Sequence, residues 1–494
     1  MLDALFSMDP LTVVLGILSV LFLLKLMNVP GNGPPGPTGY PLVGNFPLFI
    51  SGNGPKLFDQ LRQKYGDVFS LQIGSRRMVV INGYEALKEA FVKQADVFSE
   101  RPTADYVSIR SSNGKGIVRS SGEFWKNTRA FSMRALREFG FGKRSLETKI
   151  LEEISVFLEV IGKSNGDAFS LGTIAQISVS NIICSICFGE RYTHDDQNFK
   201  KLMTMIDIHV KLLSKARIAT FFPVVRYIPG DVTGVEAMGA NYENIKRFLQ
   251  EQIDKHRATF QIDNVRDLID AFILEEMTRG KTDYLEDENL AVVLNNLFVA
   301  GTETTSTTIK WAILFLISNP HIQTKLRNEI NDVIGLSRAP SMTDKPEMTY
   351  MDAFMHETFR MGNLVPFSLP HGVKQDVNFK GYTIRREDIV VPNLDSALFD
   401  ESMFEDPRTF NPDRFIGEDG KLNGKEHTVL AFSLGRRVCF GESLGRMEVF
   451  LFLTSLLQRF KLLPEDDKSL PSLEPIAGVV NHPQEFRFKA IKVN

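Results

Sequence analysis

The residues with the clearest chemical potential lie in one short segment around a cysteine. Cys439 stands in residues 432–442, FSLGRRVCFGE, and an amphipathic helix is expected to follow at once. Amide groups at the start of a helix favour a thiolate, and glycines allow the backbone to approach a flat ligand closely. Arg437 adds a fixed positive charge two residues away. The pattern therefore suits the axial thiolate ligand of a haem, with the arginine on a propionate.

The alternative for Cys439 is a buried cysteine before a helix, but this leaves the flanking glycines and arginines unexplained. Cys184 and Cys187 have the C-x-x-C spacing of redox and zinc motifs. They lie in an apolar run with no second Cys/His pair nearby to complete a zinc site, so we interpret them as core residues. Three cysteines cannot form a disulfide framework, and a reducing compartment is expected for the main body.

The pattern F-x-x-G-x-R-x-C-x-G around Cys439 resembles the haem-binding loop of the cytochrome P450 family. Other landmarks of that family follow in order, namely Trp125-x-x-x-Arg129, the segment AGTET at 300–304, Glu357-x-x-Arg360 and NPDRF at 411–415. The Pro-rich segment PPGPTGYPLVGN is similar to that of microsomal family 2 members, which oxidise drugs and fatty acids. The resemblance covers nearly the whole chain.

The resemblance implies a mainly α-helical fold with small β-sheets, formed as one large haem domain behind an N-terminal membrane anchor. It implies a monooxygenase in the endoplasmic reticulum membrane that holds haem b and inserts one oxygen atom of O2 into lipophilic substrates such as fatty acids, steroids or xenobiotics. Electrons would come from NADPH through NADPH-cytochrome P450 reductase, with cytochrome b5 as an optional second partner.

Two alternatives remain open at this point. One is a haem-thiolate isomerase or peroxide-rearranging enzyme of the same fold, which needs no reductase. The other is a non-enzymatic haem-binding protein, for which thiolate ligation is poorly suited because it favours O–O cleavage. Thr304 and Glu303 argue for oxygen activation.

The resemblance also assigns roles to single residues. Cys439 is expected to ligate the iron, and the haem propionates are expected to be held by Arg101, Trp125, Arg129, His371 and Arg437. A buried charge network is expected to clamp the cysteine loop through Glu357, Arg360 and Arg414. Glu357 and Arg360 share a helix face at i,i+3 spacing, although E-x-x-R by itself is common on surface helices.

Gly301 lies inside the longest predicted helix, residues 290–318, where glycine costs about 1 kcal/mol relative to alanine. This cost suggests a distorted turn, which the resemblance places over the distal haem face. There Thr304 is expected to hydrogen-bond oxygen, and Glu303 is expected to relay protons from solvent. Thr307 and Thr308, in the same stretch, are expected to bond back to helix carbonyls.

Matching to the family also suggests which residues face the substrate; they are Ile117, Val118, Arg119, Leu297, Ala300, Val365, Leu369, Val479 and Val480. Most are apolar, so a lipophilic substrate is expected. Arg119 is the exception, since close relatives tend to carry an apolar residue there. Its guanidinium either turns outward, pairs with Asp105 or a propionate, or receives the carboxylate of a fatty acid.

The charges nearly balance, with 57 Lys and Arg against 60 Asp and Glu, which excludes a bulk nucleic-acid binder. Cations near Trp125 and Cys439 are nevertheless expected to form a basic patch for an acidic reductase; they are Lys126, Arg134, Arg137, Lys143, Arg436 and Arg446. An apolar loop at 221–229 is expected to contact membrane lipid.

The N-terminal residues are expected to attach the chain to a membrane. Residues 11–29 are just long enough to span a bilayer if Lys25 reaches the interface. Asp3 and Asp9 precede the run and no A-x-A site follows, which disfavours a cleaved signal peptide. We therefore expect an anchor over residues 1–29, a Pro/Gly-rich linker over 30–47, and a cytosolic haem domain over 48–494.

Hydrophobic periodicity predicts a mostly helical body. Strands at 67–74 and 78–81 are expected to form a hairpin, with further short strands within 372–395 and near 474–491. Helices are expected at 85–92, 123–138, 145–162, 171–188, 197–215, 235–258, 290–318, 320–334, 349–361 and 442–460.

Overall fold

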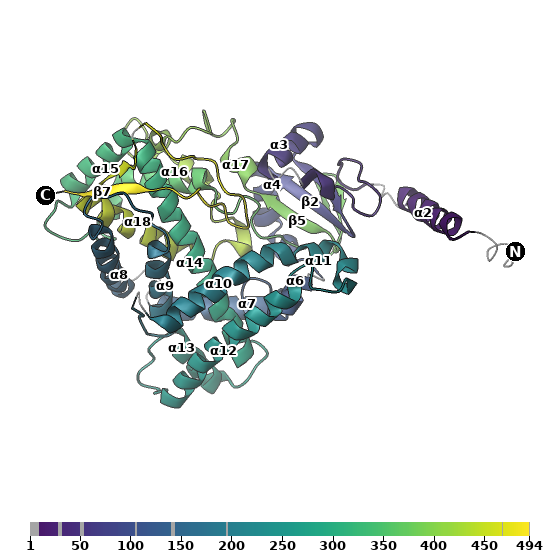
Figure 1. Cartoon of the computed structure of the whole chain (residues 1–494), viewed down its shortest axis with the longest axis horizontal. Coiled ribbons are helices and arrows are strands. Elements are labelled where there is room, and N and C mark those ends of the chain that lie inside the picture. The colour runs from purple at the N-terminus through teal and green to yellow at the C-terminus, as the bar shows by residue number, and fades with distance from the viewer. Residues whose placement is uncertain are drawn as a thin grey trace.

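The computed structural model describes residues 9–27, 32–49, 54–103, 106–139, 144–193, 196–466 and 468–493. Helices make up most of the body, and a small sheet lies to one side of them (Figure 1). The mainly α-helical class with small sheets is therefore confirmed.

Most of the longer helices have the amphipathic or largely apolar patterns expected of elements that pack on a common core, whereas the apolar α2 lies outside that core. The helices are α2 (Pro10–Met27), α3 (Gly54–Tyr65), α4 (Tyr84–Lys88), α5 (Ala95–Phe98), α6 (Tyr106–Ser112), α7 (Gly122–Glu138), α8 (Arg144–Gly162), α9 (Ile174–Cys187), α10 (Gln197–Ala216), α11 (Ile218–Phe221), α12 (Val235–Thr259), α13 (Leu268–Arg279), α14 (Asp287–Ser318), α15 (Pro320–Val333), α16 (Thr349–Gly362), α17 (Asp395–Leu398) and α18 (Glu442–Arg459). Shorter 3-10 turns are η1 (Phe46–Phe49), η3 (Pro223–Tyr227), η4 (Lys345–Glu347), η5 (Pro412–Phe415), η6 (Lys425–Thr428) and η7 (Gly435–Arg437), and η2 (Glu89–Lys93) is a π-helical turn.

The strands form three small sheets. They are β1 (Val68–Ile73), β2 (Arg76–Asn82), β3 (Val377–Phe379), β4 (Tyr382–Ile384), β5 (Ile389–Asn393), β6 (Phe460–Pro464) and β7 (Phe488–Lys492). The predicted hairpin is confirmed, because β1 pairs with β2 in antiparallel register from Val68 opposite Ile81. β2 also pairs in parallel with β5, while β3 pairs with β4 and β6 pairs with β7.

α14 is the central helix, and α9, α12, α16 and α18 all pack against it. Its geometry stays α-helical from Asp287 to Ser318, so the distorted turn predicted at Gly301 is not observed. The glycine has a packing role instead. A Cβ atom at Gly301 would lie 2.7 Å from Cδ1 of Ile183 on α9, so glycine allows the two helices to approach closely.

Cys184 and Cys187 lie fully buried in α9. Burial raises the pKa of both thiols, which keeps them protonated and unreactive. Their interpretation as core residues is confirmed.

The predicted anchor and linker fall only partly within the described residues, since residues 1–8 and 28–31 lie outside them. α2 covers most of the predicted anchor and stands apart from the helical body (Figure 1). Within the part of the chain that the structure describes, no helix combines the length and apolar character needed to cross a membrane.

A buried charge network joins α16 to the segment that follows α17. The Glu357 carboxylate accepts from Arg360 Nε at 2.7 Å and from Arg414 Nε at 3.1 Å, and Glu357 and Arg360 are fully buried. Arg360 also donates to the carbonyls of Leu398 and Pro407. The network therefore joins α16, α17 and residues 407–414 by hydrogen bonds.

We expect Arg360→Ala to lower the free energy of unfolding by about 3 kcal/mol or more, because it leaves Glu357 buried with only Arg414 as its charged partner. Urea denaturation followed by circular dichroism would measure the change. Arg110→Ala is the control, since its ion pair with Glu236 is exposed and should be worth less than about 1 kcal/mol. Equal losses in the two variants would contradict a structural role for the network.

Candidate functional site

The cysteine loop, residues 432–441, is a tight turn that ends at the start of α18. The Cys439 amide donates to the Phe432 carbonyl at 2.9 Å, which closes the loop. Gly435 has a φ of 76°, and a Cβ atom there would collide with the carbonyl oxygen of Phe91. Only glycine fits this position, so the backbone of the loop can pack directly on the η2 segment.

The electrostatics of the Cys439 thiol differ from the expectation drawn from the sequence. The Cys439 side chain is exposed, yet desolvation by the surrounding protein raises the pKa of its thiol, while the Gly441 amide and the guanidinium groups of Arg129 and Arg446 lower it, and the net shift is upward. The amide at the helix start acts in the predicted direction, but desolvation of the thiol outweighs it. A bound metal cation would deprotonate the thiol outright, so the thiolate depends on the metal.

Three guanidinium groups lie near the cysteine loop, of which Arg437 is buried and Arg101 and Arg129 are half-buried. Arg101 donates to the carbonyls of Val118 and Pro370, both at 2.8 Å. Arg129 donates to the carbonyl of Val438, and Arg437 donates only to backbone carbonyls.

In the described part of the chain none of these three groups has a carboxylate partner within ion-pair distance. Burial lowers the pKa of Arg101, Arg129 and Arg437, and mutual repulsion lowers that of Arg101 and Arg437 further. So much unpaired buried positive charge is costly unless an anion binds there.

Two further donors lie beside these arginines. Trp125 packs under Arg437, with 3.7 Å from the guanidinium carbon to the ring centroid. Its buried Nε1 has no hydrogen-bond partner among the described residues. His371 is buried and its Nδ1 lies 2.6 Å from the Phe98 carbonyl, which assigns a proton to that nitrogen.

These residues fit a haem. Its two propionates would balance the unpaired arginines and accept from the Trp125 indole, and its iron would meet the Cys439 thiolate. The predicted cofactor-binding residues Arg101, Trp125, Arg129, His371 and Arg437 thus lie in one region near Cys439.

One face of α14 keeps solvent-accessible surface although it lies in the middle of the central helix. Leu297, Gly301 and Thr304 are partly accessible and Ala300 is exposed, whereas most of α14 is buried. These positions follow i,i+3 and i,i+4 spacing, so they share one face.

The predicted pocket residues Ile117 and Val118 are held against this face of α14. Their amides both donate to Asn296 Oδ1, at 3.0 and 3.1 Å. Asn289, two turns earlier, accepts from the amide of Gly116 at 2.9 Å. Sequence reasoning missed both asparagines, although a polar amide within an apolar helix is a signal for such a contact.

The other predicted pocket residues lie on two segments joined by backbone hydrogen bonds. The Asn481 amide donates to the Leu364 carbonyl at 2.7 Å, which brings Val479 and Val480 close to Val365. The Leu369 carbonyl accepts from Arg101 at 3.2 Å. Leu369 is thereby tied to the arginine cluster.

Arg119 is partly buried and lies near His209 of α10. Burial lowers the pKa of His209 to about 4, with a further contribution from the Arg119 charge. His209 Nδ1 is buried and has no hydrogen-bond partner among the described residues. Arg119 also contributes to the lowered pKa of Arg101, so it lies between α10 and the arginine cluster. Asp105, the alternative partner, is outside the described residues.

The threonines of α14 make different contacts. Thr308 bonds back to the Thr304 carbonyl at 2.8 Å, as predicted, but the Thr307 hydroxyl lies 3.4 Å from His482 Nδ1 instead. The Thr304 hydroxyl itself donates to the Ala300 carbonyl at 2.7 Å. The hydroxyl has one proton, so Thr304 must release this bond before it can donate to a partner outside the helix.

The Glu303 carboxylate lies in a polar cluster. It lies 3.3 Å from His482 Nε2 and 3.4 Å from Gln176 Nε2, and Gln176 also donates to Asp207 at 2.9 Å. Burial and the nearby Asp207 raise the pKa of Glu303. Sequence reasoning missed Gln176, Asp207 and His482, because each comes from a different and distant segment.

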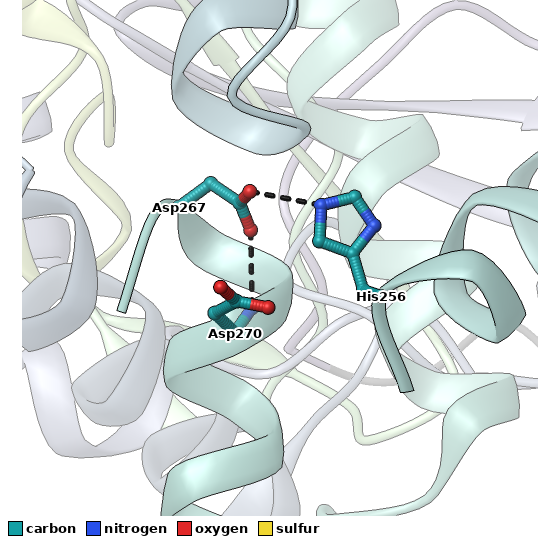
Figure 2. Close-up of side chains that lie close together, drawn as sticks. All are labelled: His256, Asp267 and Asp270. Atoms are coloured by element: carbon teal, nitrogen blue, oxygen red, sulfur yellow. Dashed lines mark hydrogen bonds and ion pairs between the residues drawn. The ribbon is translucent and has the colours of Figure 1, made fainter. Parts of the chain in front are cut away.

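A second cluster of potential metal ligands lies between α12 and α13 (Figure 2). Asp267 caps α13 by accepting from the Asp270 amide, and its other oxygen lies 2.9 Å from His256 Nε2. His256 Nδ1 lies 2.7 Å from the Gln252 carbonyl, so both ring nitrogens face acceptors and the ring carries two protons. Asp270 is held by Arg266. The cluster is therefore a structural ion pair rather than a metal site.

Comparison with known proteins agrees with the site. The sequence matches the cytochrome P450 family over residues 34–490. It is 39% identical to cytochrome P450 2C50 of Mus musculus over 489 residues, which cover 97% of this chain and 99% of that protein. It is 38% identical to cytochrome P450 2B4 of Oryctolagus cuniculus over 492 residues, with the same coverage of both chains.

The chain belongs to the cytochrome P450 family. It is a haem-thiolate monooxygenase that uses haem b, O2 and electrons derived from NADPH, and its relatives belong to family 2. Family 2 members generally use redox partners and lipophilic substrates, and their likeness to this chain points to the endoplasmic reticulum membrane. The isomerase and haem-carrier alternatives are not favoured.

We expect Cys439→His to abolish the thiolate signature in the carbon-monoxide difference spectrum of the reduced protein, because imidazole replaces the sulfur ligand. Cys187→Ala is the matched control, since that thiol is buried in α9. It should leave the signature in place. Loss of the signature in Cys187→Ala, or its survival in Cys439→His, would contradict the assignment.

Proposed function

We propose that this monooxygenase oxidises lipophilic substrates that lie against the accessible face of α14, and that long-chain acids are a preferred class. The observation that carries the proposal is the apolar face formed by Leu297 and Ala300 beside Ile117 and Val118, with Arg119 as the charged residue at its edge. Apolar surface with a single fixed charge suits a molecule with a long tail and one anionic group.

The haem, when bound, supplies the chemistry of O2 activation and oxygen transfer. Cys439 would hold its iron, and the propionates would be held by Arg101, Trp125, Arg129, His371 and Arg437. Thr304 would release its bond to the Ala300 carbonyl, and its Oγ1 would then donate a proton toward the face of the haem where O2 is bound. Glu303 would supply that proton, since its raised pKa lets the carboxyl group hold one closer to neutral pH.

Arg119 would receive the substrate carboxylate together with His209. The buried and unpartnered Nδ1 of His209 supports this idea, because a neutral imidazole can donate one hydrogen bond to an anion that Arg119 attracts. The competing role for Arg119 is a contact with a haem propionate, which its proximity to Arg101 would permit.

The basic patch near Cys439 would dock NADPH-cytochrome P450 reductase, with cytochrome b5 as a second donor. Beside it lies a depression of about 540 Å³ lined by Lys88, His427 and Arg446 among others. Four of the predicted cations already have acidic neighbours, in the pairs Lys126–Glu123, Arg134–Glu275, Arg436–Asp96 and Arg446–Glu442. Lys143 is outside the described residues. The charges of the patch would therefore raise the rate at which the reductase associates more than they raise its affinity, which would depend more on shape complementarity.

Membrane attachment would use α2 and a second contact near η3. The side chains of Leu11 and Ile17 on α2 are exposed, and so are Val224 and Tyr227 at η3. Phe222, in contrast, packs on Phe46 and does not contribute to this surface. Exposed apolar groups at both places support contact with lipid.

We expect Thr304→Ala to lower product formation by about 10²-fold while NADPH consumption continues and hydrogen peroxide rises, because the hydroxyl that donates the proton is gone. Thr308→Ala is the control on the same helix, since its hydroxyl bonds back to the Thr304 carbonyl. Product and peroxide would be measured in the reconstituted system with reductase. Unchanged coupling of NADPH use to product in Thr304→Ala would contradict its role.

We expect Arg119→Leu to weaken binding of a long-chain fatty acid by roughly 1.5–3 kcal/mol, or about 10- to 150-fold, because a charge-assisted contact is lost. Spectral titration of the haem protein would measure binding. The methyl ester of the same acid lacks the charge and should bind both forms nearly equally.

Equal losses for acid and ester would show that Arg119 acts on the fold or on a propionate. A lower haem content in Arg119→Leu would point to the propionate in particular.

A further inference from the structure

We propose that His482 is the residue that passes protons from solvent to Glu303 during turnover. This proposal rests on the proposed roles of Glu303 and Thr304. It adds a specific entry point for protons on the C-terminal segment of the chain.

His482 contacts α14 through both of its ring nitrogens. Nε2 lies 3.3 Å from Oε1 of Glu303, and Nδ1 lies 3.4 Å from Oγ1 of Thr307, one turn further along the helix. The histidine side chain is 35% exposed, against 21% for Glu303. The ring therefore touches the proposed proton donor on one side and keeps contact with water on the other.

The backbone on both sides of His482 is fixed. The neighbouring Asn481 accepts from Trp311 Nε1 of α14 at 3.1 Å, and its side chain donates to the Asn363 carbonyl at 2.9 Å. His482 itself forms a two-bond bridge with Ile476. These bonds hold the ring over Glu303 more firmly than an unsupported loop would, and proton transfer requires such a fixed distance.

The charges around the pair come from several elements. Asp207 on α10 and Lys310 on α14 act on both groups, Gln176 on α9 donates to Glu303, and Glu485 lies near Lys310. Burial raises the pKa of Glu303 and lowers that of His482. The two pKa values thus move toward each other, which reduces the free-energy cost of moving a proton between the two groups.

The transfer is balanced without any further reactant. Neutral His482, with its proton on Nε2, takes a second proton at Nδ1 from hydronium in the solvent and becomes an imidazolium, which leaves a water molecule. It then releases the Nε2 proton to Oε1 of the ionised Glu303, which becomes a neutral carboxyl group, and the histidine is left neutral with its proton on Nδ1. Glu303 passes a proton on toward Thr304, and exchange of the ring proton with solvent restores the Nε2-protonated histidine for the next transfer.

A purely structural role makes a different prediction. If His482 only holds the C-terminal segment on α14, an amide that keeps one donor and one acceptor should replace it with little effect. If it carries protons, the amide cannot replace it, because an amide does not titrate in this range. His482→Gln therefore separates the two roles.

The test compares wild type and His482→Gln as full-length holoenzymes with reductase, NADPH and a lipophilic test substrate. We expect the ratio of product to NADPH consumed to fall about tenfold, less than the roughly 10²-fold or more for complete loss of an acid–base group, because water can partly replace the histidine. Peroxide release should rise, and the rate in D2O relative to H2O should fall further than in wild type. Turnover driven by added hydrogen peroxide should stay unchanged, since peroxide brings its own protons.

His321→Gln is the matched control, because that histidine is exposed on α15. His482→Asn serves if the glutamine variant does not retain its haem spectrum. Unchanged coupling in a folded His482 variant, or an equal fall in peroxide-driven turnover, would overturn the proposal. Should Thr304→Ala also leave coupling unchanged, the proposed function of the α14 pair fails as well; uncoupling in Thr304→Ala alone would limit the failure to His482.

Discussion

The arrangement of the site depends on buried positive charge for which the described protein supplies no carboxylate within ion-pair distance. Arg101, Arg129 and Arg437 donate to backbone carbonyls of segments that are remote in sequence. These bonds join the segments, but the neutral carbonyls do not cancel the positive charges. The lowered pKa values of the three arginines measure the cost of this arrangement. A bound group with two carboxylates removes the cost, which couples the packing of these segments to haem binding.

The Cys439 thiol also needs a charged ligand, but in its case the ligand must supply positive charge. Desolvation by the surrounding protein raises the pKa of Cys439, so the protein alone favours the neutral thiol and the metal cation is needed for the thiolate. One ligand with a central cation and two peripheral anions satisfies both needs at once. Gly435 allows the cysteine loop to pack on the Phe91 backbone, which fixes the loop that carries the thiol.

α14 has one accessible face at the candidate site, and its other faces pack against the core. The face with Leu297 and Ala300 stays accessible because Asn296 holds the segment with Ile117 beside it rather than over it. Gly301, on the same face, packs closely on Ile183. Glu303 lies beside this face and contacts His482 of the C-terminal segment. The helix can therefore bring a proton from one side to a substrate surface on the other.

The long helices could be predicted from sequence because each repeats apolar residues at helical spacing over several turns. α14 and α18 agree with the predicted ranges to within three residues. Shorter helices such as α3 and α13 were not predicted. β6 begins where a helix was expected to end, because a local sequence pattern does not reveal a strand partner such as β7.

The site was predictable only in part, for a physical reason. The residues near Cys439 carry a dense motif, so their types could be identified from sequence. The direction of the Cys439 pKa shift, the pairing of Arg134 with Glu275 and the contact of Thr307 with His482 all depend on tertiary packing. Contacts between residues more than a hundred positions apart leave no trace in local periodicity.

Among the described histidines that lie beside carboxylates, His256 and His482 have surroundings that give them different properties. His256 is buried, both of its nitrogens face acceptors, and hydrogen bonds to Asp267 and Gln252 outweigh burial and raise its pKa (Figure 2). It holds its second proton firmly and joins α12 to α13. His482 is half-exposed and lies near Lys310, and its pKa is lowered. A proton that enters there is released easily, so burial and charge balance decide which of the two pairs can transfer protons.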